Sequence, residues 1–239
     1  MLRALIFDVD GTLADTESAH RAAFNRAFAE LGSAWVWDHA TYTRLLDVSG
    51  GKERILHYWQ QVQPEVRTWP LDTVRTEIER IHARKTVAYE HAVRDGSVPL
   101  RPGVQQLIVA AHAAGLRLAI ATTTTPANIA ALLSATLGPD WAAYFAVIED
   151  ASTAPSKKPD PQVYVQALQR LGLPVSDCLA FEDSANGLQA ARQAGLATII
   201  TPNGFTADHD FTAALRILPD LSGVSLADLH AWHARMPSI

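Results

Sequence analysis

Short apolar runs alternate along this chain with stretches in which apolar residues recur every three or four positions. The alternation predicts an α/β fold built on a parallel sheet, because parallel strands are joined by helices and are covered on both faces. The runs that we expect as strands are Ala4–Val9, Arg117–Thr122, Tyr144–Ile148, Cys178–Glu182 and Ala197–Thr201.

Proline and glycine mark the helices between these strands. Proline suits the first position of a helix, and glycine suits the position just past its end, where the backbone often turns left-handed. We therefore predict four helices, with the bounding residues Pro102 and Gly115, Pro126 and Gly138, Pro161 and Gly172, and Ser184 and Gly195.

The segment of residues 15–97 breaks this alternation, because it has helical periodicity and no convincing strand. Thr16 is expected to cap a helix that Gly32 ends, and a second long helix is expected over residues 72–94. We interpret 15–97 as an all-helical domain inserted after the first strand, with 1–14 and 98–239 forming the α/β core.

Composition narrows the functional classes. The chain has 239 residues and a net charge of -5, which argues against a nucleic-acid-binding protein. A single cysteine, Cys178, excludes an internal disulfide. No stretch approaches the roughly 18 apolar residues of a membrane span, and the N-terminus lacks the apolar stretch of a signal peptide. We therefore expect a soluble cytoplasmic protein without a nucleic-acid or membrane partner. A monomer is our further expectation.

The first candidate site is the pair Asp8 and Asp10, directly after an apolar strand and just before Gly11. Residues two apart in an extended chain point the same way, so both carboxylates can face the carboxyl end of the sheet, where ligands bind. One carboxylate can attack phosphorus while the other handles the proton of the leaving group. An isolated motif of this kind is equally compatible with an acidic turn.

Three further strand ends carry complementary groups. Thr122 and Thr123 follow the second strand and precede a helix, where hydroxyl and N–H groups suit a phosphate. Lys158 can neutralise a phosphate, although adjacent lysines usually mark a solvated loop. Glu182 and Asp183 follow the fourth expected strand and suit Mg²⁺, although acidic residues also favour a helix start. The joint pattern over four loops is what predicts a phosphate-transferring site.

The four motifs resemble those of the haloacid-dehalogenase superfamily. The resemblance covers the chain to about Asn203, and the tail after Phe205 carries no motif that we can place. It implies a Rossmann-like parallel-sheet core with an inserted helical cap domain. The matching residues are DVDGTL at 8–13, Thr122, Lys158 in KKPDP, and Glu182 with Asp183.

The resemblance implies a role for each of these residues. Asp8 attacks phosphorus, and Asp10 protonates the leaving oxygen and then activates water. Such phosphoryl transfer depends on in-line positioning and on neutralising charge, which an ion and a lysine supply. The remaining implied roles are Thr122 and Lys158 on the phosphoryl oxygens, and Mg²⁺ held by Asp8, the Asp10 carbonyl, Asp183 and, through water, Glu182.

The helical insertion is similar to the cap of the phosphoglycolate phosphatase and β-phosphoglucomutase branch of this superfamily. Within that branch the chain is most similar to the CbbY-type phosphatases. One such enzyme hydrolyses xylulose-1,5-bisphosphate, an inhibitory side product of Rubisco, so the resemblance implies a sugar-bisphosphate phosphatase. The insertion supplies candidate substrate contacts, although each is also compatible with a surface charge or a packing residue. The candidates are a loop with Gly50, Gly51, Lys52 and Arg54, for which Lys52 or Arg54 would grip the second phosphate, together with Glu17, His20 and Lys85.

Other functions stay open on the sequence. A β-phosphoglucomutase-like mutase is compatible with His20 and Lys85, which stand about where the mutase branch has a histidine and a lysine. A phosphoglycolate-type monophosphatase would use the same core motifs. A phospho-ligand sensor on the same fold is a third alternative, because fold alone does not determine function.

Overall fold

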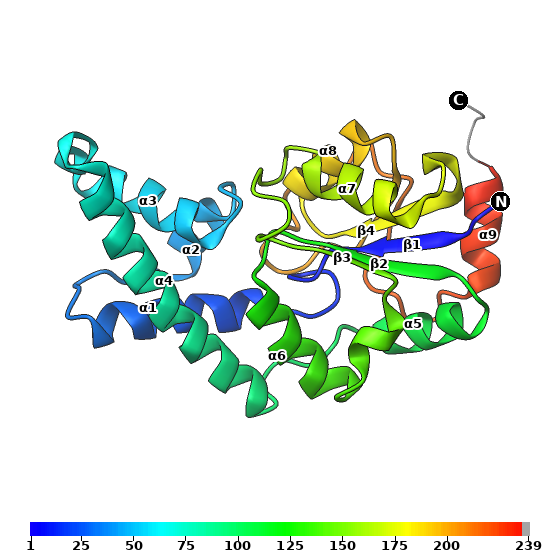
Figure 1. Ribbon diagram of the computed structural model, residues 1–239, viewed down its shortest axis with the longest axis horizontal. Coiled ribbons are helices and arrows are strands. Elements are labelled where there is room, and N and C mark those ends of the chain that lie inside the picture. The colour runs from blue at the N-terminus through cyan, green and yellow to red at the C-terminus, as the bar shows by residue number, and fades with distance from the viewer. Residues whose placement is uncertain (236–239) are drawn as a thin grey trace.

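Six parallel strands form a sheet in the order β3-β2-β1-β4-β5-β6 in the computed structural model, which describes residues 1–235. Helices cover both faces, as the apolar runs predict (Figure 1). The fold is therefore the expected Rossmann-like α/β core. The strands are β1 (Ala4–Phe7), β2 (Arg117–Ala121), β3 (Val147–Glu149), β4 (Cys178–Glu182), β5 (Ala197–Ile200) and β6 (Arg216–Ile217).

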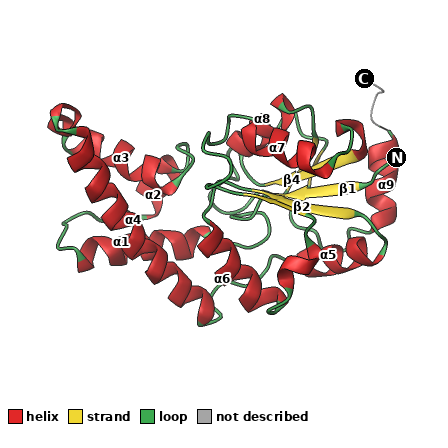
Figure 2. Ribbon diagram, viewed as in Figure 1, coloured by secondary structure: helices red, strands yellow, loops and turns green. Residues whose placement is uncertain are grey.

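Helices account for most of the remaining described chain (Figure 2). None of those within residues 1–235 is long and apolar enough to cross a membrane. The α-helices are α1 (Glu17–Glu30), α2 (His39–Leu45), α3 (Gly51–Val62), α4 (Leu71–Arg94), α5 (Val104–Ala113), α6 (Pro126–Leu137), α7 (Gln162–Leu171), α8 (Ala185–Gln193) and α9 (Leu226–Ala234); the 3₁₀ turns are η1 (Pro64–Thr68), η2 (Trp141–Tyr144) and η3 (Val175–Asp177).

Strand β1 lies at the centre of the sheet and is buried on both faces. Leu5 and Phe7 pack in the cluster that includes α5 and α6, whereas Ala4 and Ile6 pack in the cluster that includes α7 and α8. Alternate side chains of a strand point to opposite faces, so a continuous apolar run is what this position requires. The loop after β1 is consequently placed in the middle of the carboxyl edge of the sheet.

Several predicted boundaries needed correction. The predicted strand Tyr144–Ile148 begins too early, because Tyr144 ends the 3₁₀ turn η2 and β3 starts at Val147. Of the three prolines expected to open helices, only Pro126 is the first residue of one. Pro102 lies two residues before α5, and Pro161 lies just outside α7. The glycines past the helix ends behave as predicted, and Gly172 is left-handed with φ of 61°.

Residues 15–97 emerge from the core after β1 and return before α5, and they contain only helices and turns. Their core is aromatic: Phe24, Phe28, Trp37 and Tyr42 are all buried there. Helix α4 packs against α1 and also against α6 of the core. The two ends of the insertion meet in a bridge between Ala14 and Leu100.

Arg101 follows this bridge and joins distant parts of the chain. Its guanidinium donates to the carbonyl oxygens of Gly11 and Thr201, to that of Pro202 at 2.7 Å, and to that of Pro219 at 3.1 Å. A planar group with several fixed donors can satisfy carbonyl oxygens on more than one loop at once. Arg101 thus ties the turn after β1 to the loop after β5 and to the C-terminal tail.

Replacement of Arg101 by methionine is expected to lower the free energy of unfolding by about 2 to 3 kcal/mol, because several carbonyl oxygens lose a charged donor. Urea denaturation measures this change. The matched control is Arg80→Met, since Arg80 is exposed and pairs with Glu77 on its own helix; we expect this control to leave stability nearly unchanged. Equal stability of the two variants would contradict the role of Arg101.

Candidate active site

The register of the sheet places three predicted motifs side by side. Phe7 of β1 lies opposite both Ile120 of β2 and Phe181 of β4. The residues that follow these positions therefore meet at one edge. Asp8 is buried there, and its N–H donates to the carbonyl oxygen of Phe181 at 3.0 Å.

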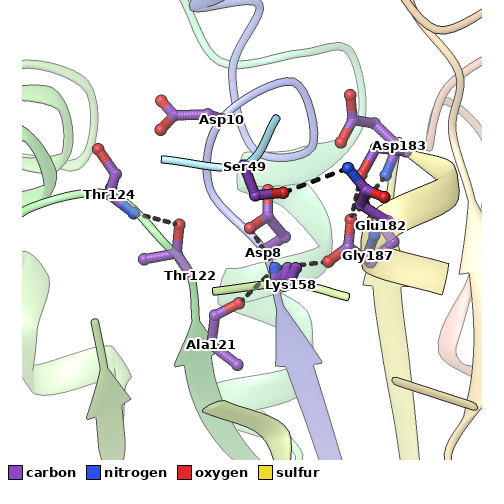
Figure 3. A network of polar contacts seen from close by, with 12 residues as sticks. Asp8, Asp10, Ser49, Ala121, Thr122, Thr124, Lys158, Glu182, Asp183 and Gly187 are labelled. Atoms are coloured by element: carbon purple, nitrogen blue, oxygen red, sulfur yellow. Dashed lines mark hydrogen bonds and ion pairs between the residues drawn. The ribbon is translucent and has the colours of Figure 1, made fainter. Parts of the chain in front are cut away.

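Lys158 connects these strand ends (Figure 3). Its ammonium group donates to Asp8 Oδ1 at 2.6 Å, to Glu182 Oε1 at 2.5 Å and to the Ala121 carbonyl oxygen at 2.9 Å. Burial alone would lower the pKa of Lys158, but the carboxylates of Asp8 and Glu182 raise that pKa above its ordinary value. Lys158 is therefore a permanent positive charge at the carboxyl edge of the sheet.

Three carboxylates gather beside this lysine. One oxygen from each of Asp8, Glu182 and Asp183 lies within 4.8 Å of the others, and all three residues are buried. Burial, followed by repulsion from the neighbouring carboxylates, raises the pKa of Asp183 well above its ordinary value. Such an arrangement of hard oxygen donors with excess negative charge fits a divalent cation, which would relieve the repulsion.

Asp183 is held by a residue that the motifs did not include. Asn203 donates its amide N–H to Asp183 Oδ2 at 2.7 Å, while its own Oδ1 accepts from the Phe205 N–H at 2.8 Å. Gly11 has φ of 83°, and a side chain there would collide with Asp183 and Asn203. Asn203 follows β5 closely, so the strand-end argument applied to the fifth strand would have found it.

Asp10 belongs to a second buried network. Its Oδ1 accepts from the Thr16 hydroxyl at 2.8 Å and contacts His20 Nε2 at 2.9 Å, and His20 Nδ1 lies 2.6 Å from Lys85 Nζ. Burial raises the pKa of Asp10, but His20, Thr16 and Lys85 outweigh it and hold the pKa below its ordinary range. The lysine of the helical insertion thus reaches a core carboxylate through one imidazole.

The prediction that Thr16 caps a helix needs correction. It occupies the residue before α1, but its backbone is helical, with φ of -86° and ψ of -17°, and its side chain makes no capping hydrogen bond. Its hydroxyl is engaged by Asp10 instead. A capping residue normally has an extended backbone, so the helical backbone of Thr16 accounts for the missing cap, and its hydroxyl binds Asp10.

Arg54 is not on a flexible loop, because Gly51 begins α3 and Arg54 lies in its first turn. Its guanidinium donates to the Leu45 carbonyl oxygen at 3.1 Å and the Tyr42 hydroxyl at 3.1 Å, and it also reaches the Val48 carbonyl oxygen. The Tyr42 hydroxyl in turn donates to Glu17 Oε2 at 2.7 Å. Arg54 is predicted to bind the substrate with its positive charge, and Glu17 is predicted to bind it with its carboxylate. Both belong to one buried hydrogen-bond network through Tyr42.

Lys52 departs from its predicted position. Its side chain is 50% exposed, and its ammonium lies 3.6 Å from Glu79 on α4. Lysine and arginine two residues apart on a helix point in different directions, so the same turn buries Arg54 and exposes Lys52. The expectation that Lys52 faces the substrate depended on this segment being a loop.

All other predicted site residues line a single cavity between the core and the insertion. These are Asp8, Asp10, Glu17, His20, Gly50, Gly51, Arg54, Lys85, Thr122, Thr123, Lys158, Glu182 and Asp183. Lining residues outside the predicted set come mainly from helix starts and from the loop after β5, and their polar side chains form no recognisable motif. They include Phe24, Ser49, His82, Thr124, Asn128, Asn186, Thr206 and His209.

Two contacts bring the core against the insertion at the rim of this cavity. Asn186 at the start of α8 donates to the Asp47 carbonyl oxygen at 2.9 Å and to Ser49 Oγ at 3.3 Å. Phe205, from the loop after β5, is buried in the aromatic cluster of the insertion, and its ring stacks on His39 with centroids 4.7 Å apart. The core and the insertion are therefore in direct contact beside the cavity.

His82 of α4 borders the cavity opposite the start of α3. A side chain at Gly51 would come within 2.8 Å of His82 Nε2, so glycine is needed for this close approach. Burial, followed by the charges of Lys85 and Lys52, lowers the pKa of His82 to about 3. The imidazole is consequently neutral in the folded protein.

Comparison with protein families matches residues 2–195 to the haloacid dehalogenase-like hydrolases. The CbbY protein encoded on a plasmid of Cupriavidus necator is 53% identical over 97% of this chain and 97% of its own length. A CbbY protein of Rhodobacter capsulatus is 48% identical over 94% of this chain and 96% of its own length.

Among solved structures, CbbY from Rhodobacter sphaeroides in a variant complexed with xylulose-(1,5)bisphosphate is 41% identical to this chain. It superposes with a TM-score of 0.86 and covers 96% of this chain and 99% of its own. A β-phosphoglucomutase from Clostridium difficile superposes with a TM-score of 0.77 at 18% identity, which supports the shared fold alone.

Replacement of His82 by glutamine is expected to reduce the loss of stability in acid. Below pH 6.5 the unfolded chain binds a proton at this histidine that the folded chain does not, so stability falls as the pH drops from about 6.5 toward 3. For each unit that the pH falls within this window, the free energy of unfolding of the variant should rise by about 1.4 kcal/mol relative to that of wild type. Urea denaturation between pH 7 and pH 5 measures the gain.

The exposed His230→Gln variant is the control, and we expect its stability to run parallel to that of wild type over the same range. Parallel curves for His82→Gln as well would show that His82 does not resist protonation.

Proposed function

Because the chain belongs to the haloacid dehalogenase-like hydrolase family and is a phosphatase related to CbbY proteins, we propose that it hydrolyses a sugar bisphosphate, namely xylulose-1,5-bisphosphate. The observation that carries the proposal is Asp8, which lies 2.6 Å from Lys158 in the cavity between the core and the insertion. The similarity to a CbbY structure that holds this sugar bisphosphate supports the choice of substrate.

Asp8 is the nucleophile in this proposal. Its carboxylate attacks phosphorus, and the bond to the sugar oxygen breaks as an aspartyl-phosphate forms. Lys158 and the Thr122 hydroxyl neutralise and orient the transferring phosphoryl oxygens, which is the main task of a protein in such a transfer. The position of Lys158 between Asp8 and Glu182 supports this role.

Asp10 acts as general acid and then as general base. Its lowered pKa suits the second step, in which an ionised carboxylate accepts a proton from the water that hydrolyses the aspartyl-phosphate. In the first step, the negative charge of the bound phosphate raises the pKa of Asp10 and favours the protonated form. His20 and Lys85 keep the carboxylate oriented throughout.

The acidic cluster fits Mg²⁺, which we propose as the cofactor. Asp8 and Asp183 would be direct ligands with the Asp10 carbonyl oxygen, whereas Glu182 Oε1 already accepts from Lys158 and from the Tyr164 hydroxyl at 2.6 Å, which favours contact through water. The ion supplies charge stabilisation for the phosphoryl group when bound.

We propose that residues 15–97 form a cap domain that selects the substrate. Arg54 is the cation for the second phosphate, because it lines the cavity and three of its five N–H groups are held by the insertion itself. Glu17, oriented by the Tyr42 hydroxyl, is a hydrogen-bond acceptor for sugar hydroxyls.

Purified protein with Mg²⁺ is expected to release inorganic phosphate from xylulose-1,5-bisphosphate more efficiently than from sugar monophosphates such as xylulose-5-phosphate, as measured by a coupled phosphate assay. Removal of Mg²⁺ with EDTA should abolish turnover, and added Mg²⁺ should restore it. Asp8→Asn should lower kcat by at least about a thousandfold, because it removes the nucleophile.

Absence of phosphate release from xylulose-1,5-bisphosphate would contradict the proposed substrate. An isomeric sugar phosphate in place of free phosphate, detected by ³¹P NMR, would instead identify a mutase that uses the His20 and Lys85 network.

The contacts across the cavity rim support closure of the cap on the substrate. Replacement of Phe205 by alanine removes the aromatic ring that enters the insertion, so we expect a larger radius of gyration of the free protein in X-ray scattering. Phe145→Ala is the matched control, since Phe145 is equally buried at 7% exposure but packs within the core. Identical scattering of both variants and wild type would argue against this closing contact.

A further inference from the structure

The turn between α2 and α3, residues 46–50, forms part of the cavity wall. Three of its residues line the cavity, namely Leu46, Ser49 and Gly50. The turn belongs to neither helix, because α2 ends at Leu45 and α3 begins at Gly51. Its position therefore depends on the side chains that bind its polar groups from other elements.

Arg54 of α3 holds this turn from within the insertion. Its guanidinium donates to the carbonyl oxygen of Leu45, at the edge of the turn, and to that of Val48 within it, at 3.1 and 3.3 Å. Each contact orients the guanidinium as well as the turn, since the donors of this group have a planar and rigid geometry. The direction of the remaining Arg54 N–H groups therefore depends on the position of the turn.

Asn186 holds the same turn from the core. Its Nδ2 donates to the Asp47 carbonyl oxygen at 2.9 Å and to Ser49 Oγ at 3.3 Å, and the second contact is drawn in Figure 3. Asp47 precedes Val48, which Arg54 binds, and Ser49 follows it. One side chain of the core and one of the insertion therefore bind interleaved groups of a single turn.

The start of α8 places Asn186 close to the acidic cluster. Ser184 Oγ accepts from the Gly187 N–H at 3.1 Å, and His209 Nδ1 accepts from the N–H of the first residue of α8 at 3.2 Å. A side chain at Gly187 would collide with Glu182, so the helix begins in direct contact with the cluster. Asn186 therefore connects the turn to a part of the core that is itself firmly held.

We infer that Asn186 is a positioning residue for substrate selection, which holds the turn of residues 46–50 so that Arg54 is directed at the second phosphate. The inference rests on the proposed sugar-bisphosphate activity. Asn186 acts through the turn and not on the reacting atoms. Its hydrogen bonds join the core to the insertion, so they also make recognition of the second phosphate depend on closure of the cap.

The first test compares Asn186→Ala with wild type on two substrates, xylulose-1,5-bisphosphate and p-nitrophenyl phosphate, which has no second phosphate. Alanine removes both hydrogen bonds, so we expect KM for the sugar bisphosphate to rise about fivefold with kcat little changed. KM and kcat for p-nitrophenyl phosphate should stay within about twofold of wild type. The control is Gln193→Ala on the same helix, which should change neither KM, since Gln193 donates to the Pro159 carbonyl oxygen within the core at 3.0 Å.

A double-mutant cycle tests whether Asn186 acts through Arg54. In an Arg54→Met background there is no guanidinium to direct, so Asn186→Ala should raise KM by less than about twofold. Hydrogen exchange of the backbone amides of residues 45–54 gives a second readout, which does not require the Arg54 variant to fold. Exchange there should be at least about threefold faster in Asn186→Ala than in wild type, and it should be unchanged in β1 and β4.

An unchanged KM for Asn186→Ala, or unchanged hydrogen exchange of the turn, would overturn the inference. An equal loss on p-nitrophenyl phosphate would show general damage to the site in place of a loss of selection. An equally large effect in the Arg54→Met background would show that Asn186 does not act through Arg54. Wild type inactive on xylulose-1,5-bisphosphate but active on p-nitrophenyl phosphate would refute the proposed substrate, whereas hydrogen exchange would still test the positioning of the turn.

Discussion

The buried ion pairs of Lys158 with Asp8 and Glu182 are the interaction on which the rest of the site depends. They bring a loop before α7 against the ends of β1 and β4, at 2.6 and 2.5 Å. One cation does not balance the carboxylates gathered there, and the raised pKa of Asp183 reflects its burial and then the remaining repulsion. An excess of buried negative charge is unfavourable for stability but suits a cation and a phosphoryl group. The buried charges therefore make this part of the core less stable, while they suit the binding of a cation and a phosphoryl group.

The helical insertion contains two polar networks, and one of them reaches this core at Asp10. Lys85 reaches Asp10 by way of His20, and Arg54 reaches Glu17 by way of Tyr42. The members of each network are largely buried, although the Asp10 side chain is 20% exposed, so they have few alternative partners. Buried polar groups that satisfy one another define a single geometry, which is what a specific binding surface needs.

The region after β5 has no recognisable motif, yet it supports the site from outside. Asn203 holds Asp183, Phe205 enters the aromatic core of the insertion, and Pro219 accepts a hydrogen bond from Arg101. Arg101 also binds Gly11, so the turn after β1 and the tail share one guanidinium. Residues that act through backbone carbonyls or through another side chain leave little trace in sequence patterns, because many local sequences can supply the same carbonyl group.

The sequence by itself determined five of the six strands of the sheet and the all-helical character of residues 15–97, and it missed β6. Strands buried on both faces must be apolar throughout, and the carboxyl ends of parallel strands meet at one edge, so Asp8, Lys158 and Asp183 follow from local pattern and topology. Only the tertiary structure decided between Lys52 and Arg54, which the sequence treated alike: one helical turn exposes the first and buries the second. It also showed that the Thr16 hydroxyl binds Asp10 and does not cap a helix. Within the described residues, it showed that Asn128 Oδ1 has no hydrogen-bond partner. Local periodicity places a residue on an element, but its partners depend on which distant groups pack against it.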